Sequence, residues 1–146
     1  MARIARRGRR EIPRRPGPAT DDDLVARAVE LLDRRYVPGR HTVAAAVRTR
    51  SGAIYVGVNI EGIHTPCAEP VAVGAAVTAG ESSIEAMVAV GRRGSTYHLL
   101  APCGTCRQLL FDYAPRGYAL VPGRDGRWKR LSAQEALPSP FATFGD

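Results

Sequence analysis

Two short segments decide how this chain folds, Pro66-Cys67-Ala68-Glu69 and Pro102-Cys103-Gly104-Thr105-Cys106, and they hold all three cysteines of the sequence. Apolar helical patterns run from Cys67 to Ala79 and from Pro102 to about Tyr113, so each cysteine lies at or just inside a predicted helix start. The N-terminus of a helix favours the thiolate over the thiol, because the helix dipole and unpaired N–H groups stabilise negative charge. We therefore expect a fold that brings the three thiolates together.

Three converging thiolates would repel one another without a cation. Zinc is the natural candidate, because it prefers sulfur ligands in tetrahedral geometry. Cys67, Cys103 and Cys106 would leave a fourth position open, which is typical of catalytic zinc sites and would hold a water of lowered pKa. Glu69, in the first helical turn, could take a proton from that water without binding the metal. The sequence therefore predicts a catalytic site with one zinc ion per chain.

Other interpretations of the cysteines stay open at this point. The Cys103–Cys106 pair has the spacing of a redox motif, although that leaves Cys67 and Glu69 unexplained. The three cysteines could be small apolar residues of the core. A structural zinc site would need a fourth ligand, for which His64 is available.

The chain resembles the cytidine deaminase superfamily, in particular its small homotetrameric nucleoside branch, which includes blasticidin-S deaminase. The resemblance spans about Tyr36 to Phe141, and its motifs are Val56-Gly-Val-Asn-Ile-Glu61, Pro66–Glu69, Pro102–Leu110 and Ala136–Phe141. The pattern C-x-E followed by P-C-x-x-C is the signature of zinc deaminases, with cysteine in place of the first histidine. It implies Cys67, Cys103 and Cys106 as zinc ligands and Glu69 as the residue that shuttles protons.

The resemblance also implies residues that contact the substrate. Asn59 and Glu61 match a motif that binds ribose hydroxyls, although they could simply end an edge strand. The Ala68 N–H and the carbonyl near Ala101–Pro102 would face the reacting amine. Phe141 resembles a C-terminal aromatic residue that reaches the pocket of a neighbouring subunit, with plain core packing as the alternative. A homotetramer is therefore expected.

Two departures from the family pattern leave the substrate open. Pro70 stands where cytidine deaminases typically carry an arginine. The segment Tyr36–Thr42 replaces the usual entry residues, and the loop between Asn59 and Cys67 is shorter than usual. Arg40 or His41 could meet a substrate carboxylate or sugar, although we favour solvated residues at the start of a strand.

We expect hydrolytic deamination of a free cytosine nucleoside, or of a cytosine nucleoside antibiotic such as blasticidin S, giving the uracil product and ammonia. Pyrimidine salvage is one setting for such a reaction. One alternative is a deaminase that acts on DNA or RNA. The other is a catalytically silent, zinc-stabilised nucleoside-binding protein.

The order of elements predicts an α/β fold with three α-β-α layers and a mixed sheet of about five strands. A helix should begin at Thr20 and end near Arg35. The remaining helices are expected over 67–79 and 102–113 and after the capping box Ser132–Glu135. Strands are expected over 42–48, 53–60, 84–90, 97–100, 118–121 and 127–131.

The net charge of +7 is concentrated at the N-terminus, where residues 1–18 carry seven arginines and one glutamate, which is +6. We expect residues 1–19 to form a disordered arm and residues 20–146 one nearly neutral zinc deaminase domain. The arm could contact nucleic acid nonspecifically, although we favour a dispensable extension.

No apolar run reaches the length of a membrane span, and no secretory signal is visible. Together with an odd number of cysteines, this predicts a cytoplasmic protein with no membrane partner.

Overall fold

The computed structural model describes residues 3–4 and 18–141, so most of the expected arm lies outside the described residues. Helix α1 (Asp21–Arg35) begins at Thr20, as predicted. The Thr20 hydroxyl accepts a hydrogen bond from Asp23 N–H, and the Asp23 carboxylate accepts one from Thr20 N–H. This capping box satisfies N–H groups that the first helical turn leaves unpaired. The buried residues on the apolar face of α1 are Leu24, Ala28 and Leu32.

Strands β2 (Val43–Thr49) and β3 (Ile54–Val58), both predicted from sequence, form an antiparallel hairpin. Gly52 turns the chain with a φ of 90°, a conformation that glycine adopts without steric cost. Strand β2 is buried on both faces, because its side chains alternate between two apolar clusters. Ala44 and Ala46 belong to the cluster around α1, and Ala45 and Val47 to the cluster around α2.

Strand β4 (Ile84–Arg93) is the centre of the sheet, with β2 antiparallel along one edge. Its other edge is shared by two strands. Strand β5 (Thr96–Leu100) runs antiparallel to residues 89–93, and β6 (Tyr118–Pro122) runs parallel to residues 86–88. The parallel pair makes the sheet mixed, as predicted. β4 extends through Arg92 and Arg93, where the sequence suggests a turn, because both residues pair with β5.

Strand β7 (Trp128–Ser132) pairs with β6 and ends at helix α4 (Ala133–Ala136), where Ser132 and Glu135 form the predicted capping box. Within the described residues the sheet has seven strands, more than the five or so expected. One of them is the two-residue strand β1 (Arg3–Ile4), which pairs with the edge of β5 inside the segment expected to be disordered. An open strand edge offers unpaired backbone groups that can hold such a short strand.

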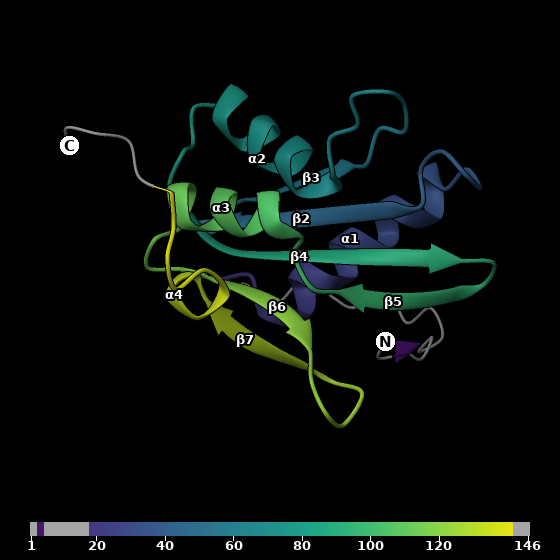
Figure 1. Cartoon of the computed structure of the whole chain (residues 1–146). Coiled ribbons are helices and arrows are strands. Elements are labelled where there is room, and N and C mark those ends of the chain that lie inside the picture. Colours follow the sequence, from purple (N-terminus) through teal and green to yellow (C-terminus); the bar gives the residue numbers. More distant parts are fainter. Residues whose placement is uncertain (1–2, 5–17, 142–146) are drawn as a thin grey trace.

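The three expected layers are present. Figure 1 shows α1 on one side of the sheet, and α2 (Ala68–Thr78), α3 (Gly104–Tyr113) and α4 on the other. Helix α2 lies directly on β3, where a Cβ on Gly57 would come within 2.5 Å of the backbone nitrogen of Ala72. Glycine at this position therefore sets how closely the start of α2 approaches the sheet.

The starts of α2 and α3 meet at the point where β5 and β6 separate along β4. β5 ends at Leu100, opposite Ala89 of β4, and residues 101–103 cross from there to the start of α3. Crevices at such points in α/β sheets commonly hold ligands. Among the described residues, no helix combines the length and the apolar character needed to cross a membrane.

Candidate metal centre and pocket

The three cysteines come together between the starts of α2 and α3. Cys67 is the N-cap of α2, Cys103 is the N-cap of α3, and Cys106 lies in the first turn of α3. The sulfurs of Cys67 and Cys103 are 3.6 Å apart, and all three sulfurs lie within 4.8 Å of one another. The redox interpretation covers two of these residues, whereas the structure brings all three into one cluster.

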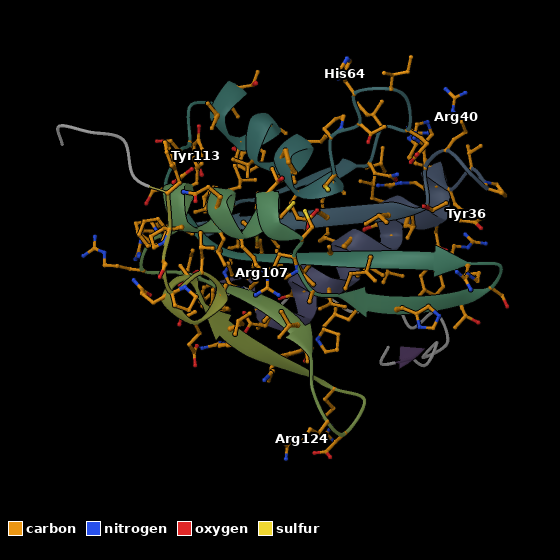
Figure 2. The ribbon with its side chains drawn as sticks, viewed as in Figure 1. Tyr36, Arg40, His64, Arg107, Tyr113 and Arg124 are labelled. Carbon is orange, nitrogen blue, oxygen red and sulfur yellow. The ribbon has the colours of Figure 1, made fainter. Side chains whose placement is uncertain are left out.

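The donor set fits zinc. Zinc binds thiolate sulfur at about 2.3 Å, so two sulfurs of a tetrahedral site lie about 3.8 Å apart, close to the observed Cys67–Cys103 distance. In the described part of the chain the cluster contains these three cysteines, and His64 is not a member of it. His64 lies exposed on the loop before α2, away from the sulfurs (Figure 2). Three ligands with an open fourth position are typical of catalytic rather than structural zinc.

The electrostatics of the cluster call for a cation. Burial and the neighbouring Cys103 thiol raise the pKa of Cys67. Burial and the charge of Glu69 raise the pKa of Cys106, which is fully buried. Burial opposes ionisation of Cys103 too, but hydrogen bonds from the backbone and side chain of Cys106 outweigh it and lower the Cys103 pKa. Without a metal ion, the surroundings therefore disfavour the thiolate at Cys67 and Cys106, whereas bound zinc would favour it at all three cysteines.

Glu69 lies beside the sulfurs in the first turn of α2 and is 5% exposed. Burial raises the pKa of Glu69, and hydrogen bonds with its own backbone N–H and with the Cys106 thiol offset only part of this effect. No ion pair with a basic residue is found for this carboxylate among the described residues. A raised pKa makes the Glu69 carboxylate a stronger base than an exposed glutamate, which suits a residue that accepts and returns a proton.

A pocket of about 220 Å³ opens onto Cys67 and Cys103. Seven of the expected site residues line it, namely Asn59, Glu61, Cys67, Ala68, Glu69, Ala101 and Cys103, whereas Cys106 is not part of the lining. Further lining residues are Val43, Thr65, Pro66, Ala89 and Leu100. No lysine, arginine or aromatic side chain lines the pocket in the described part of the chain.

The Asn59 side chain lines the pocket and also holds the start of β2. Its Oδ1 accepts hydrogen bonds from the N–H groups of Thr42 and Val43, each at 3.0 Å, and its Nδ2 donates to the carbonyl of Arg40. His41 Nδ1 donates to the Asn59 carbonyl at 2.8 Å. Asn59 and His41 therefore contribute to the ending of an edge strand, one of the two roles considered for Asn59. The exposed side chain of Arg40 lies on the same side as the 59–66 loop (Figure 2).

Phe141 lies outside the lining of the pocket and is 73% exposed, so it does not pack in the core of its own chain. Its backbone is held in place by Gln108 of α3. The Gln108 side chain accepts from Phe141 N–H and donates to the Phe141 carbonyl, both at 3.0 Å. The position of Phe141 is therefore well defined, although its ring has no pocket within the described residues of this chain.

Sequence reasoning missed several residues at or next to the site. Val43, Ala89 and Leu100 form the apolar floor, but a strand pattern alone does not show which strand ends meet at a pocket. Arg107 donates through Nε to the Pro102 carbonyl and through Nη1 to the Ala136 carbonyl. Its place directly after a predicted ligand is a signal that could have marked it as part of the site.

Comparison with known proteins agrees with this geometry. Residues 18–119 match the family described as the cytidine and deoxycytidylate deaminase zinc-binding region. Blasticidin-S deaminase of Bacillus cereus is 36% identical over 129 residues, which cover 83% of this chain and 91% of that protein. Cytidine deaminase of Halalkalibacterium halodurans is 30% identical over 123 residues, covering 81% of this chain and 91% of its own length.

Solved structures show the same fold. Cytidine deaminase from Burkholderia pseudomallei superposes with a TM-score of 0.70 at 28% identity, covering 84% of this chain and all of that one. Cytidine deaminase from Mycobacterium tuberculosis gives a TM-score of 0.68 at 30% identity, covering 86% of this chain and all of that one. The predicted α/β fold and the zinc cofactor are thereby confirmed. The chain belongs to the cytidine and deoxycytidylate deaminase family and is a zinc-dependent deaminase.

Proposed function

We propose that this enzyme hydrolyses a free cytosine nucleoside, or a cytosine nucleoside antibiotic such as blasticidin S, to the uracil product and ammonia. The observation that carries the proposal is the position of Glu69. Its buried carboxylate shares one pocket with the three-thiol cluster and with Asn59 and Glu61. Relatives named as blasticidin-S deaminase and cytidine deaminase support both substrate classes.

The residues of the pocket divide the work of the reaction. Cys67, Cys103 and Cys106 would hold zinc, which would act as a Lewis acid and lower the pKa of a water molecule. Glu69 accepts a proton from the attacking water and donates it to the ring nitrogen of the base. A second proton transfer through Glu69 allows ammonia to leave. The Ala68 N–H and the Ala101 carbonyl, both in the lining, orient the base and its amino group.

The charge of the pocket favours a free nucleoside over a nucleotide or a nucleic acid. The acidic side chains of Glu61 and Glu69 line it, and no basic side chain of the described residues does so. A phosphate group would meet repulsion there without a compensating cation. We therefore assign Glu61 and Asn59 to the sugar hydroxyls. A hydroxyl can donate a hydrogen bond to the Glu61 carboxylate, and another can accept one from the second N–H of Asn59 Nδ2, whose first N–H donates to the Arg40 carbonyl.

A second copy of the chain completes the site in our proposal, as part of a homotetramer. The outward side of α2 carries the half-buried Pro70 and the exposed Gly74 and Val77, and the whole helix after Glu69 has no charged residue. A helix that is apolar on all sides is usually covered on all sides. The exposed ring of Phe141 would then reach the pocket of a neighbouring copy. The described lining of that pocket contains no aromatic residue, so the ring would supply one.

The substrate assignment is tested with purified protein, ultraviolet absorbance and a panel of cytidine, deoxycytidine, blasticidin S, deoxycytidine monophosphate and single-stranded DNA. We expect turnover of at least one of the first three and none of the last two. Zinc analysis should give about one ion per chain. If the wild type and Glu69→Gln behave alike on every compound, the protein is a silent binder. Turnover of single-stranded DNA would instead assign it to nucleic acid.

The assembly is tested by measuring the molar mass in solution of Val77→Glu and Val37→Glu. The two valines are similarly exposed, at 42% and 44%, but only Val77 lies on α2. We expect Val77→Glu to dissociate the tetramer and to lower activity, while Val37→Glu retains the wild-type mass. A monomeric wild type with full activity would exclude a shared site.

Three reduced cysteines in one cluster also suit the reducing cytoplasm, where we place the enzyme.

A further inference from the structure

Arg107 is a half-buried basic residue in the second turn of α3, directly after the ligand Cys106. No carboxylate lies within ion-pair distance of its guanidinium in the described part of the chain. Its side chain instead donates two hydrogen bonds to backbone carbonyls, from Nε to Pro102 at 3.0 Å and from Nη1 to Ala136 at 2.9 Å. The guanidinium of Arg107 is thus used to hold two backbone carbonyls rather than to neutralise a carboxylate.

The contacts of Arg107 enclose one zinc ligand. The backbone N–H of Arg107 donates to the Cys103 carbonyl at 2.9 Å, and its side chain holds the carbonyl of the preceding residue, Pro102. Both peptide groups that flank Cys103 are therefore held by one residue. The planar guanidinium presents several donors in a rigid fork, so one side chain can bind two carbonyls in defined directions.

The second carbonyl, that of Ala136, ends helix α4, which follows β7. Figure 2 shows Arg107 on the side of α3 that faces β6 and α4. The turn Ala101–Cys103 carries pocket-lining residues and has no regular structure of its own. Arg107 thus connects this turn to an element that is anchored in the core through Ala133 and Ala136.

We infer that Arg107 is a positioning residue, which holds the Pro102–Cys103 turn against the end of α4 and so sets the orientation of the Cys103 thiolate toward zinc. The inference rests on the proposed function only in that the zinc site is the reacting centre. Groups that orient the ligands of a metal change metal affinity or activity about 10- to 100-fold when they are removed. Arg107 acts on its ligand through the backbone rather than through the sulfur.

The test compares Arg107→Gln and Arg107→Lys with Arg116→Gln in the full-length chain. Arg116 is an exposed arginine just beyond α3 and serves as the matched control. Zinc dissociation constants are measured by competition with a chromophoric chelator. We expect Arg107→Gln to weaken zinc binding about 10- to 100-fold. Arg107→Lys should recover part of the loss, because an ammonium can hold one carbonyl but not both, and Arg116→Gln should match the wild type.

The visible absorption of the cobalt-substituted protein gives a second readout, because it reports the geometry of the thiolate ligands. We expect altered bands in Arg107→Gln and wild-type bands in Arg116→Gln. A residue that merely stabilised the fold would lower the Tm of the zinc-free protein while leaving these bands and the zinc affinity unchanged. That result, in Arg107→Gln or, if it does not fold, in Arg107→Lys, overturns the inference.

The two proposals fail in different ways. If the wild type binds zinc but turns over no cytosine compound, the proposed function is wrong, and the difference in zinc affinity still tests Arg107. If the wild type is active and Arg107→Gln retains wild-type zinc affinity and cobalt bands, the proposed function stands and the role of Arg107 is wrong.

Discussion

Two carboxylates with little solvent exposure lie on opposite faces of the sheet, Asp21 (6% exposed) in the first turn of α1 and Glu69 (5% exposed) in the first turn of α2. Asp21 is surrounded by donors: Arg48 at 3.0 Å, and Tyr118 and Arg130 at 2.8 Å. Burial alone would raise the pKa of Asp21, but these hydrogen bonds outweigh it and hold the pKa below its usual range. One carboxylate thereby connects α1 to β2, β6 and β7.

Glu69 has the opposite surroundings. Burial raises its pKa, and hydrogen bonds with its own N–H and the Cys106 thiol do not compensate. The two pKa shifts thus have opposite signs: two arginines and a tyrosine donate hydrogen bonds to Asp21, whereas burial dominates at Glu69. A partnered buried charge holds the fold together, whereas one left without a cation costs stability and is retained where chemistry requires it.

Glu69→Gln should have the largest effect on activity and almost none on the fold. Losing the proton-transfer group costs about 10²- to 10⁴-fold in kcat. The free energy of unfolding should stay the same or rise, because an unpaired buried charge is removed. Activity is measured by ultraviolet absorbance and stability by urea denaturation of the same preparation. Wild-type kcat in the variant would remove Glu69 from the mechanism.

Asp21→Asn should have the reverse pattern, a large effect on stability and almost none on activity. The substitution keeps the shape of the side chain but leaves Arg48 short of a negative partner in a buried position, so we expect unfolding to become easier by about 3 kcal/mol. Arg48 still pairs with Glu85 at 2.7 Å, which places the effect at the lower end of the range for broken buried pairs. At temperatures below its unfolding transition, the variant should keep the wild-type kcat. A stability equal to that of the wild type would show that this cluster contributes nothing to the fold.

The stability difference between wild type and Asp21→Asn should depend on pH. The pKa of Asp21 is lowered in the folded protein, so its contribution is fully present above the unfolded value of about 3.9 and is lost as pH falls through the folded pKa. Urea denaturation is measured at a series of pH values from 7 to 3. The difference in the free energy of unfolding should stay constant down to about pH 4 and shrink below it. A difference that grows toward low pH would contradict the assigned sign.

Arg130→Gln should have the smallest effect. Arg130 also pairs with Asp21, but its side chain is 60% exposed, and exposed ion pairs contribute about 0 to 1 kcal/mol. We therefore expect a small loss in the free energy of unfolding that decreases further in high salt. A loss as large as that of Asp21→Asn would show that the exposed arginine, not the buried Arg48, is the main partner of Asp21.

Sequence reasoning reached most of the fold, because its signals are local. The helix start at Thr20 and the capping box at Ser132 depend on residues within a few positions of one another. It missed the extension of β4 to Arg93, since pairing with β5 rather than local preference sets that end. It also missed β1, which depends on the open edge of a distant strand.

The candidate site divides in the same way. Three cysteines and a glutamate at helix starts are visible in the sequence, because metal ligation demands particular residue types at particular spacings. Two features are not visible there: the hydrogen bonds that commit Asn59 to the start of β2, and the contact of Arg107 with Ala136. Both join segments far apart in the chain, so no spacing marks them.

By itself, the sequence determined the chemistry of this protein: which atoms can hold zinc and which carboxylate can move a proton. The tertiary structure decided that arginines pair with the carboxylate of Asp21 and that the carboxylate of Glu69 has no basic partner among the described residues. It also decided how the turn that carries Cys103 is held. The physical reason is that thiolate and carboxylate chemistry belongs to the residue, whereas desolvation and hydrogen-bond partners come from elements that only folding brings together.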